Sequence, residues 1–145
     1  MPINCSCRPL PSLRRYPLSY LVAVAILLLS LLPIGAVEIA KNVPFADKWT
    51  HMVMYAVFAL AIGHEYWRRH SADSRDAVRL LFWAVLAPIL MGGTLELLQA
   101  YATSYRSGEW LDFAANSLGV VIGFCLSLLI HYIYRWSHND KARSR

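Results

Sequence analysis

The side chains best suited to chemistry are an acid, an imidazole and a phenol that recur every four residues, at Asp47, His51 and Tyr55. On a helix this spacing puts all three on one face. Glu96 and Gln99 share a face of a second apolar segment in the same way. Because a carboxylate can orient an imidazole to act as a general base, the catalytic candidates are His51 with Glu96 or Asp47.

A third polar stripe opens the last apolar segment. Asp112 and Asn116 share a helical face with Gly119 and Gly123. The two glycines form a small-xxx-small pattern, which lets a neighbouring helix backbone approach closely. We therefore expect the polar end of this stripe to be drawn against another helix.

Two cations complete the group of candidate binding residues. Lys48 and Arg106 lie beside the same apolar segments, and arginine suits bidentate contacts with phosphate or carboxylate groups. Glu96 lies about 7 to 8 Å inside its segment if that helix ends near Tyr101, at 1.5 Å per residue. At this depth it needs a partner, for which His51 and the two cations are the candidates.

Each of these polar residues also has a purely structural interpretation. Asp112 favours a helix start through the helix dipole, and Asn116 and Gln99 can form hydrogen bonds between helices. Glu96 is the hardest to explain by packing alone, because burying a carboxylate costs free energy. The grouping of all of them favours a shared pocket, with ligand-binding residues Asp47, Lys48, His51, Tyr55, Glu96, Gln99, Arg106, Asp112 and Asn116.

Long apolar segments must position these side chains. Of the 145 residues, 57% are hydrophobic and 16% are charged, which is too apolar for an ordinary soluble domain and argues against a nucleic-acid partner. A membrane-spanning helix needs about 20 mostly apolar residues. Four segments qualify: Leu18–Val37, Trp49–Trp67, Leu80–Tyr101 and Phe113–Tyr134. The predicted fold class is all-α, an integral membrane four-helix bundle.

The distribution of Lys and Arg predicts the orientation of this bundle. The first, third and last polar segments hold eleven of the 14 basic residues, and the two intervening ones hold three. Because basic residues are retained on the cytoplasmic side, both termini should be cytoplasmic. The candidate pocket would then face outward from a multi-pass membrane protein.

The predicted organisation has one membrane domain. Residues 1–17 form a cytoplasmic N-terminal segment, 18–134 the transmembrane domain and 135–145 a basic cytoplasmic tail. The first span resembles a secretory signal because Arg14 and Arg15 precede it, but its apolar run is longer than the usual 7 to 15 residues. We interpret it as an anchor.

The opposite, inner end offers no predicted site. Glu65 and the charged residues after it are expected to form a solvated loop, and His64, His131 and His138 show no metal-binding spacing. Cys125 is expected to be a small packing residue. No cofactor is predicted. A metal held by Asp47, His51 and Glu96 is only weakly indicated, so we expect no stoichiometric metal.

The order of the polar residues resembles the VanZ-like family of small bacterial membrane proteins. The shared pattern is D-K-x-x-H-x-x-x-Y from Asp47 to Tyr55, then E-x-x-Q at Glu96, then Arg106 followed by D-x-x-x-N-x-x-G from Asp112. The resemblance covers about half the chain, from Asp47 to Gly123. It implies a multi-pass protein of the bacterial cytoplasmic (inner) membrane. The namesake of the family is associated with resistance to the glycopeptide antibiotic teicoplanin, but the resemblance implies no agreed mechanism.

Three function classes remain open. The first is an envelope-modulating protein whose pocket binds an anionic, lipid-linked or headgroup-like ligand, such as an envelope precursor or a glycopeptide, with membrane lipids as further partners. The second is a membrane-embedded hydrolase or transferase acting on a lipid-linked substrate, with His51 as base. The third is a homo-oligomeric assembly partner or small transporter. Transport is the least favoured, because transport sites usually lie near the bilayer midplane.

Overall fold

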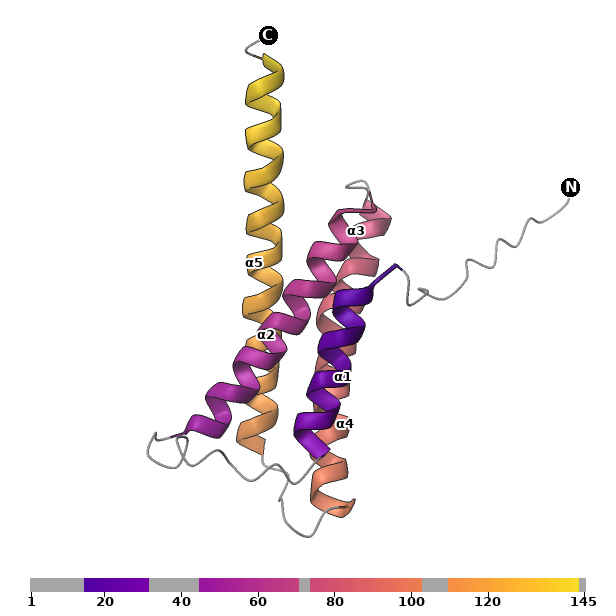
Figure 1. Cartoon of the computed structure of the whole chain (residues 1–145), viewed down its shortest axis with the longest axis vertical. Coiled ribbons are helices and arrows are strands. Elements are labelled where there is room, and N and C mark those ends of the chain that lie inside the picture. Colours follow the sequence, from indigo (N-terminus) through magenta and orange to yellow (C-terminus); the bar gives the residue numbers. More distant parts are fainter. Residues whose placement is uncertain (1–14, 32–44, 71–73, 103–109, 144–145) are drawn as a thin grey trace, which may run out of the picture.

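The computed structural model describes residues 15–31, 45–70, 74–102 and 110–143, and within them the fold is all-α (Figure 1). Helix α1 spans Pro17–Leu31 and α2 spans Ala46–Trp67. Helix α3, Ser74–Leu81, continues through a π-helical turn, η2 (Phe82–Leu86), into α4, Ala87–Ala102. Helix α5, Trp110–Arg143, is the longest. The all-helical prediction is therefore confirmed.

Two helical stretches among the described residues are long and apolar enough to cross a membrane. They are Asp76–Tyr101, with 26 residues, and Trp110–His138, with 29. Helix α1 is apolar but shorter, and the rest of the first expected span, residues 32–37, lies outside the described residues. Helix α5 continues beyond the expected fourth span into the segment predicted to be a tail, so residues 135–143 are helical.

Helices α2 and α5 form the most extensive contact in the bundle. At Gly119 an added side-chain carbon would overlap the backbone carbonyl of Met52, and at Gly123 it would overlap that of Ala56. Only glycine allows the two backbones to approach this closely, which confirms the expectation from the small-xxx-small spacing. This contact sets the position of the polar residues at the start of α5.

Helix α1 is attached to α2 through its first turn. The Glu65 carboxylate accepts hydrogen bonds from the backbone N–H groups of Leu18 (2.8 Å) and Ser19 (3.1 Å) and from the Ser19 hydroxyl (2.6 Å). Pro17 suits the first helical position, because it has no N–H to satisfy. The prediction that Glu65 lies in a solvated loop is wrong, since α2 extends past it and buries it against α1.

The core is small and the surface is apolar. Buried residues such as Ile26, Phe58, Leu80 and Val120 form one cluster between the helices. Large apolar side chains nevertheless remain exposed along all the long helices. Cys125 is one of the exposed residues, so the prediction that it packs inside is wrong. It lies on the opposite face of α5 from the glycines.

Candidate functional site

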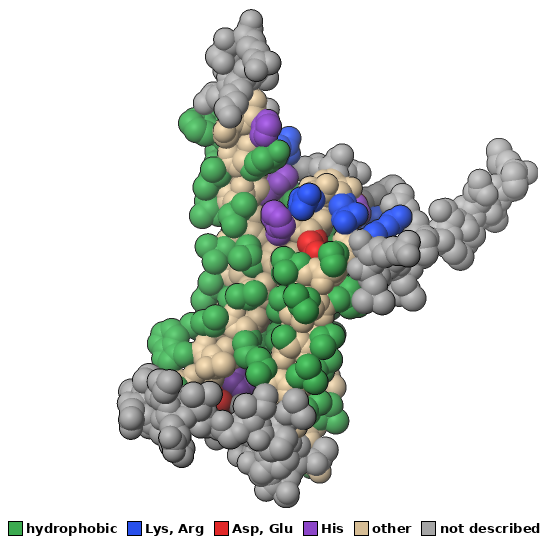
Figure 2. Space-filling view, in the orientation of Figure 1, with side chains coloured by type: hydrophobic (Ala, Val, Ile, Leu, Met, Phe, Trp, Pro, Cys, Tyr) green, Lys and Arg blue, Asp and Glu red, His purple; other side chains and the backbone are tan. Residues whose placement is uncertain are grey.

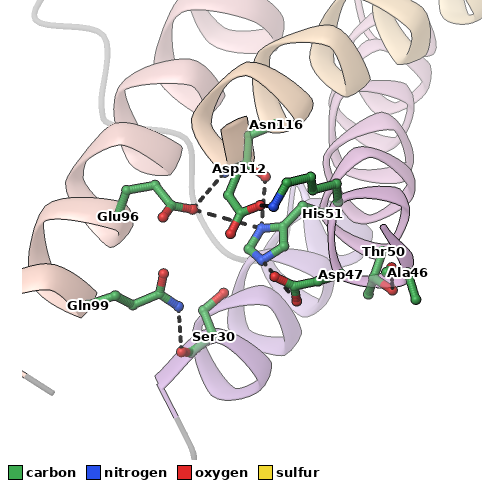
Figure 3. A network of polar contacts seen from close by, with 10 residues as sticks. Ser30, Ala46, Asp47, Thr50, His51, Glu96, Gln99, Asp112 and Asn116 are labelled. Atoms are coloured by element: carbon green, nitrogen blue, oxygen red, sulfur yellow. Dashed lines mark hydrogen bonds and ion pairs between the residues drawn. The ribbon is translucent and has the colours of Figure 1, made fainter. Parts of the chain in front are cut away.

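Three helix ends converge on one polar cluster, shown in Figure 3. The start of α2 contributes Asp47, Lys48 and His51, and the start of α5 contributes Asp112 and Asn116. Helix α4 contributes Glu96 from its last turns. Side chains from three separate stretches of the sequence are thus brought into one site.

A buried chain of polar groups links α4, α5 and α2. The Asn116 side-chain nitrogen Nδ2 donates to Glu96 Oε1 at 3.3 Å, and Asn116 Oδ1 lies 3.0 Å from His51 Nδ1. The exposed fractions of these residues are 8% for Glu96, 1% for Asn116 and 4% for His51. The predicted approach of His51 to Glu96 is present, with 3.9 Å between Nδ1 and Oε1, but Asn116 makes the connecting hydrogen bonds.

This chain fixes the orientation of the imidazole. An ionised Glu96 carboxylate only accepts hydrogen bonds, so the Asn116 amide must turn its NH₂ group toward Glu96. The Asn116 oxygen then faces His51 and requires a proton on Nδ1. In the neutral imidazole the lone pair is therefore on Nε2, the nitrogen on the side of Asp47.

Asp47 lies at the accessible edge of the site. Its side chain is 57% exposed, and Oδ1 is 3.8 Å from His51 Nε2. The imidazole ring therefore has one carboxylate near each nitrogen, Asp47 at Nε2 and Glu96 at Nδ1. Because Asp47 reaches solvent and Glu96 does not, Asp47 connects the buried chain to the surface.

Lys48 and Asp112 form an ion pair beside this chain. Lys48 Nζ lies 3.1 Å from Asp112 Oδ1, and the Asp112 side chain is only 5% exposed. Asp112 lies in the first turn of α5, where the helix dipole stabilises a negative charge. Lys48 was a candidate partner for Glu96, and the structure pairs it with Asp112 instead.

Tyr55 lies one helical turn deeper, next to Gly92. Its side chain is 1% exposed, and its hydroxyl has no hydrogen-bond partner among the described residues. A side-chain carbon at Gly92 would lie 3.3 Å from the Tyr55 hydroxyl and 3.4 Å from Asn116 Cβ. Gly92 therefore makes room for Tyr55 beside Asn116, and it lies on the same face of α4 as Glu96, one turn away.

Gln99 extends from the same side of α4 as Glu96, but its amide reaches Ser30 at the end of α1 and not His51 (Figure 3). Its side-chain nitrogen donates to the backbone carbonyl of Ser30 at 2.8 Å. This contact joins α4 to α1, as the structural interpretation of Gln99 anticipated. Sequence reasoning missed Ser30, because a backbone acceptor on a distant helix has no sequence signature.

Among the residues that the structure describes, one set of groups could hold a metal ion. Asp47, His51 and Asp112 each offer a ligand atom, and these atoms lie within 4.8 Å of one another. The set differs from the weakly indicated one, since Asp112 replaces Glu96. The Lys48 ammonium already provides a positive charge at Asp112, so a cation would have to compete with it there.

Of the nine predicted binding residues, the structure describes eight, and Arg106 lies outside the described residues. Six of the eight, Asp47, Lys48, His51, Glu96, Asp112 and Asn116, join the polar cluster directly. Tyr55 lies beneath it and Gln99 beside it. No family model, curated protein or solved structure matches the chain.

Proposed function

We propose that the chain is a VanZ-like protein of the bacterial cytoplasmic membrane, with four membrane-spanning helices and a polar pocket that opens at the outer surface. The pocket binds the polar head of a lipid-linked envelope component and thereby modulates the envelope, including its susceptibility to glycopeptide antibiotics. The resemblance from Asp47 to Gly123 supports the family, and the basic residues support the orientation.

The surface supports the membrane placement. Exposed apolar residues occur on each long helix, for example Leu21 on α1, Val53 on α2, Leu97 on α4 and Ile133 on α5. Figure 2 shows hydrophobic side chains over the middle of the molecule and arginines gathered near its upper end. An apolar belt with basic residues at one edge is typical of a membrane protein, because the bilayer core excludes charges and basic residues are retained on the cytoplasmic side.

The observation that carries the proposal is the convergence of buried polar groups behind one exposed carboxylate. Three acids and one lysine give the described part of the site more negative than positive charge. Such a pocket accepts hydrogen bonds from hydroxyl or ammonium groups, which are typical of sugar and amino headgroups. The described residues therefore favour these groups over the anionic ligand expected from the sequence. Arg106, the second cation on which that expectation depended, lies outside the described residues.

The test is an unbiased comparison of lipids and envelope precursors in a deletion strain, in which ligand uptake and glycopeptide susceptibility are also measured. The strain is complemented with the wild-type chain, Glu96→Gln or His51→Ala, and membrane levels are matched by immunoblot. The proposal predicts that both variants behave like the deletion in ligand uptake or glycopeptide susceptibility. Wild-type behaviour of both variants would contradict it.

A second candidate function, a hydrolase or transferase, is favoured by the orientation of His51. If Nδ1 donates to Asn116 Oδ1, the neutral imidazole has its lone pair on Nε2, which is the state a general base needs. In this alternative His51 removes a proton from water or an acceptor hydroxyl, and Glu96 acts through Asn116 as a positioning residue.

The same comparison separates the two functions. A catalyst predicts that one lipid-linked precursor accumulates in the deletion strain and in His51→Ala cells. A binding protein predicts altered uptake or susceptibility while lipid composition stays unchanged.

A further inference from the structure

A cavity lies at the end of the α2–α5 pair opposite the Asp47 cluster. Its volume is about 940 Å³, and it is lined by the end of α2 and by residues 127–135 of α5. Here α5 carries bulky side chains, including Ile130, His131 and Tyr134, in place of the glycines that contact α2 further down. The helices therefore leave a space between them, and no residue of the Asp47 cluster lines it.

The lining of this cavity is basic. Arg68 and Arg135 lie at its edge together with His64, His70 and His131, and no acid is among the described residues that line it. Figure 2 shows Lys or Arg side chains and histidines gathered on this face, with one acidic side chain beside them. Two guanidinium groups beside one cavity suit a phosphate group, which arginine binds through paired hydrogen bonds.

Two buried nitrogen atoms in the lining have no partner among the described residues. They are Nε1 of Trp67 and Nε2 of His131, and the two rings stack with 4.1 Å between centroids and 10° between planes. The indole N–H can only donate, so the missing partner at Trp67 must be an acceptor. An unpaired buried donor is costly, and a phosphate oxygen would satisfy it once the indole turns its N–H, which solvent does not reach in this structure, into the cavity.

The remaining lining identifies the kind of phosphate. Leu60 and Ile130 give the cavity apolar walls below the arginines, which suits an acyl chain rather than a fully solvated ion. We propose that this cavity binds an anionic phospholipid, with the headgroup phosphate held by Arg68, Arg135 and the Trp67 indole. The proposal rests on the membrane placement above. It does not depend on the ligand of the polar pocket around Asp47, His51 and Glu96, the Asp47 pocket.

The test uses the purified full-length chain in detergent with dioleoyl phosphatidylglycerol or dioleoyl phosphatidylcholine, and native mass spectrometry counts the bound lipids. We expect phosphatidylglycerol to bind the wild type about tenfold more tightly, because both lipids offer a phosphate but the choline ammonium of phosphatidylcholine is repelled by Arg68 and Arg135. The double variant Arg68→Ala/Arg135→Ala should lose this preference. The matched control Arg69→Ala/Arg79→Ala removes the same charge from residues that do not line the cavity and should retain it.

Three results would overturn the proposal. An equal loss in both double variants would indicate general attraction between charges. Displacement of the lipid by inorganic phosphate at equal concentration would mean that the acyl chain contributes nothing. Unchanged affinity in Trp67→Phe, which keeps an aromatic ring but removes the N–H, would exclude the indole contact. None of these results depends on the function of the Asp47 pocket, whose variants are measured separately.

Discussion

The two ends of the α2–α5 pair differ in how closely the helices approach. Near Asp47 the backbones touch through Gly119 and Gly123, and the polar side chains around this contact bind one another. Near Trp67 the same helices carry aromatic and branched residues and enclose a basic cavity. Residue size along α5 thus determines whether the two helices touch or leave a cavity between them.

Two buried acids extend this comparison. Glu65, at the Trp67 end, accepts all three of its hydrogen bonds from the first turn of α1, which satisfies the carboxylate and anchors a helix. Glu96, at the Asp47 end, contacts an amide that in turn orients an imidazole. Burial of an acid therefore does not identify a functional residue, but the chemistry of its partners does.

The largest expected loss of stability comes from adding a side chain at the glycine contact between α2 and α5. Gly119→Ala would push a methyl group into the Met52 carbonyl, and such overpacking should lower the free energy of unfolding by about 3 kcal/mol. Thermal unfolding in detergent, followed by circular dichroism, measures the loss. Gly93→Ala is the control, since its new carbon meets only the movable Phe113 ring at 3.2 Å. Equal stability of the two variants would show that the backbones do not touch.

The second prediction separates anchoring from function at Glu65. Glu65→Ala leaves the N–H groups of Leu18 and Ser19 without their acceptor, so we expect a loss of about 2 kcal/mol. Ser19→Ala removes only one of the three hydrogen bonds and should cost about 1 kcal/mol. At matched protein levels the envelope phenotype of both should remain wild type. A lost phenotype with unchanged stability would make Glu65 functional and end the contrast with Glu96.

The third prediction concerns Asn116, the link between Glu96 and His51. Asn116→Ala should cost about 1 to 2 kcal/mol and should remove the envelope phenotype even where protein levels are restored. Ser117→Ala is the matched control, because the Ser117 hydroxyl bonds only within α5, to the Phe113 carbonyl. Unfolding and susceptibility assays on the same preparations and strains measure the two effects. A normal phenotype in Asn116→Ala would mean that the chain of polar contacts from Glu96 to His51 contributes only to packing.

The smallest effect is expected at the partly exposed ion pair. Lys48→Met leaves the buried Asp112 carboxylate without its cation, but the helix dipole and the 22% exposure of Lys48 limit the loss to about 1 kcal/mol. Thr50→Ala, whose hydroxyl bonds only to Ala46 in its own helix, is the control. Thermal unfolding should separate the two, and an identical midpoint would contradict a stabilising role for the pair.

The sequence predicted the helical fold and most of the polar cluster, because helical spacing is local. Asp47 and His51 share a face four residues apart, and the Gly119–Gly123 spacing predicted the close contact. Contacts between distant helices were harder to assign, so Lys48 was not matched to Asp112. Glu65 was misassigned because its hydrogen-bond donors, at Leu18 and Ser19, belong to a distant helix and have no local sequence signature.

Side-specific labelling tests most directly whether the Asp47 pocket opens at the outer surface of a membrane. Single substitutions Asp47→Cys and Arg69→Cys, both at exposed positions near opposite ends of α2, are made in a chain carrying Cys5→Ser, Cys7→Ser and Cys125→Ser. A membrane-impermeant maleimide is then applied to spheroplasts before and after lysis. The account predicts that Asp47→Cys reacts before lysis and Arg69→Cys only afterwards. The reverse order, or equal reaction of both before lysis, would contradict it.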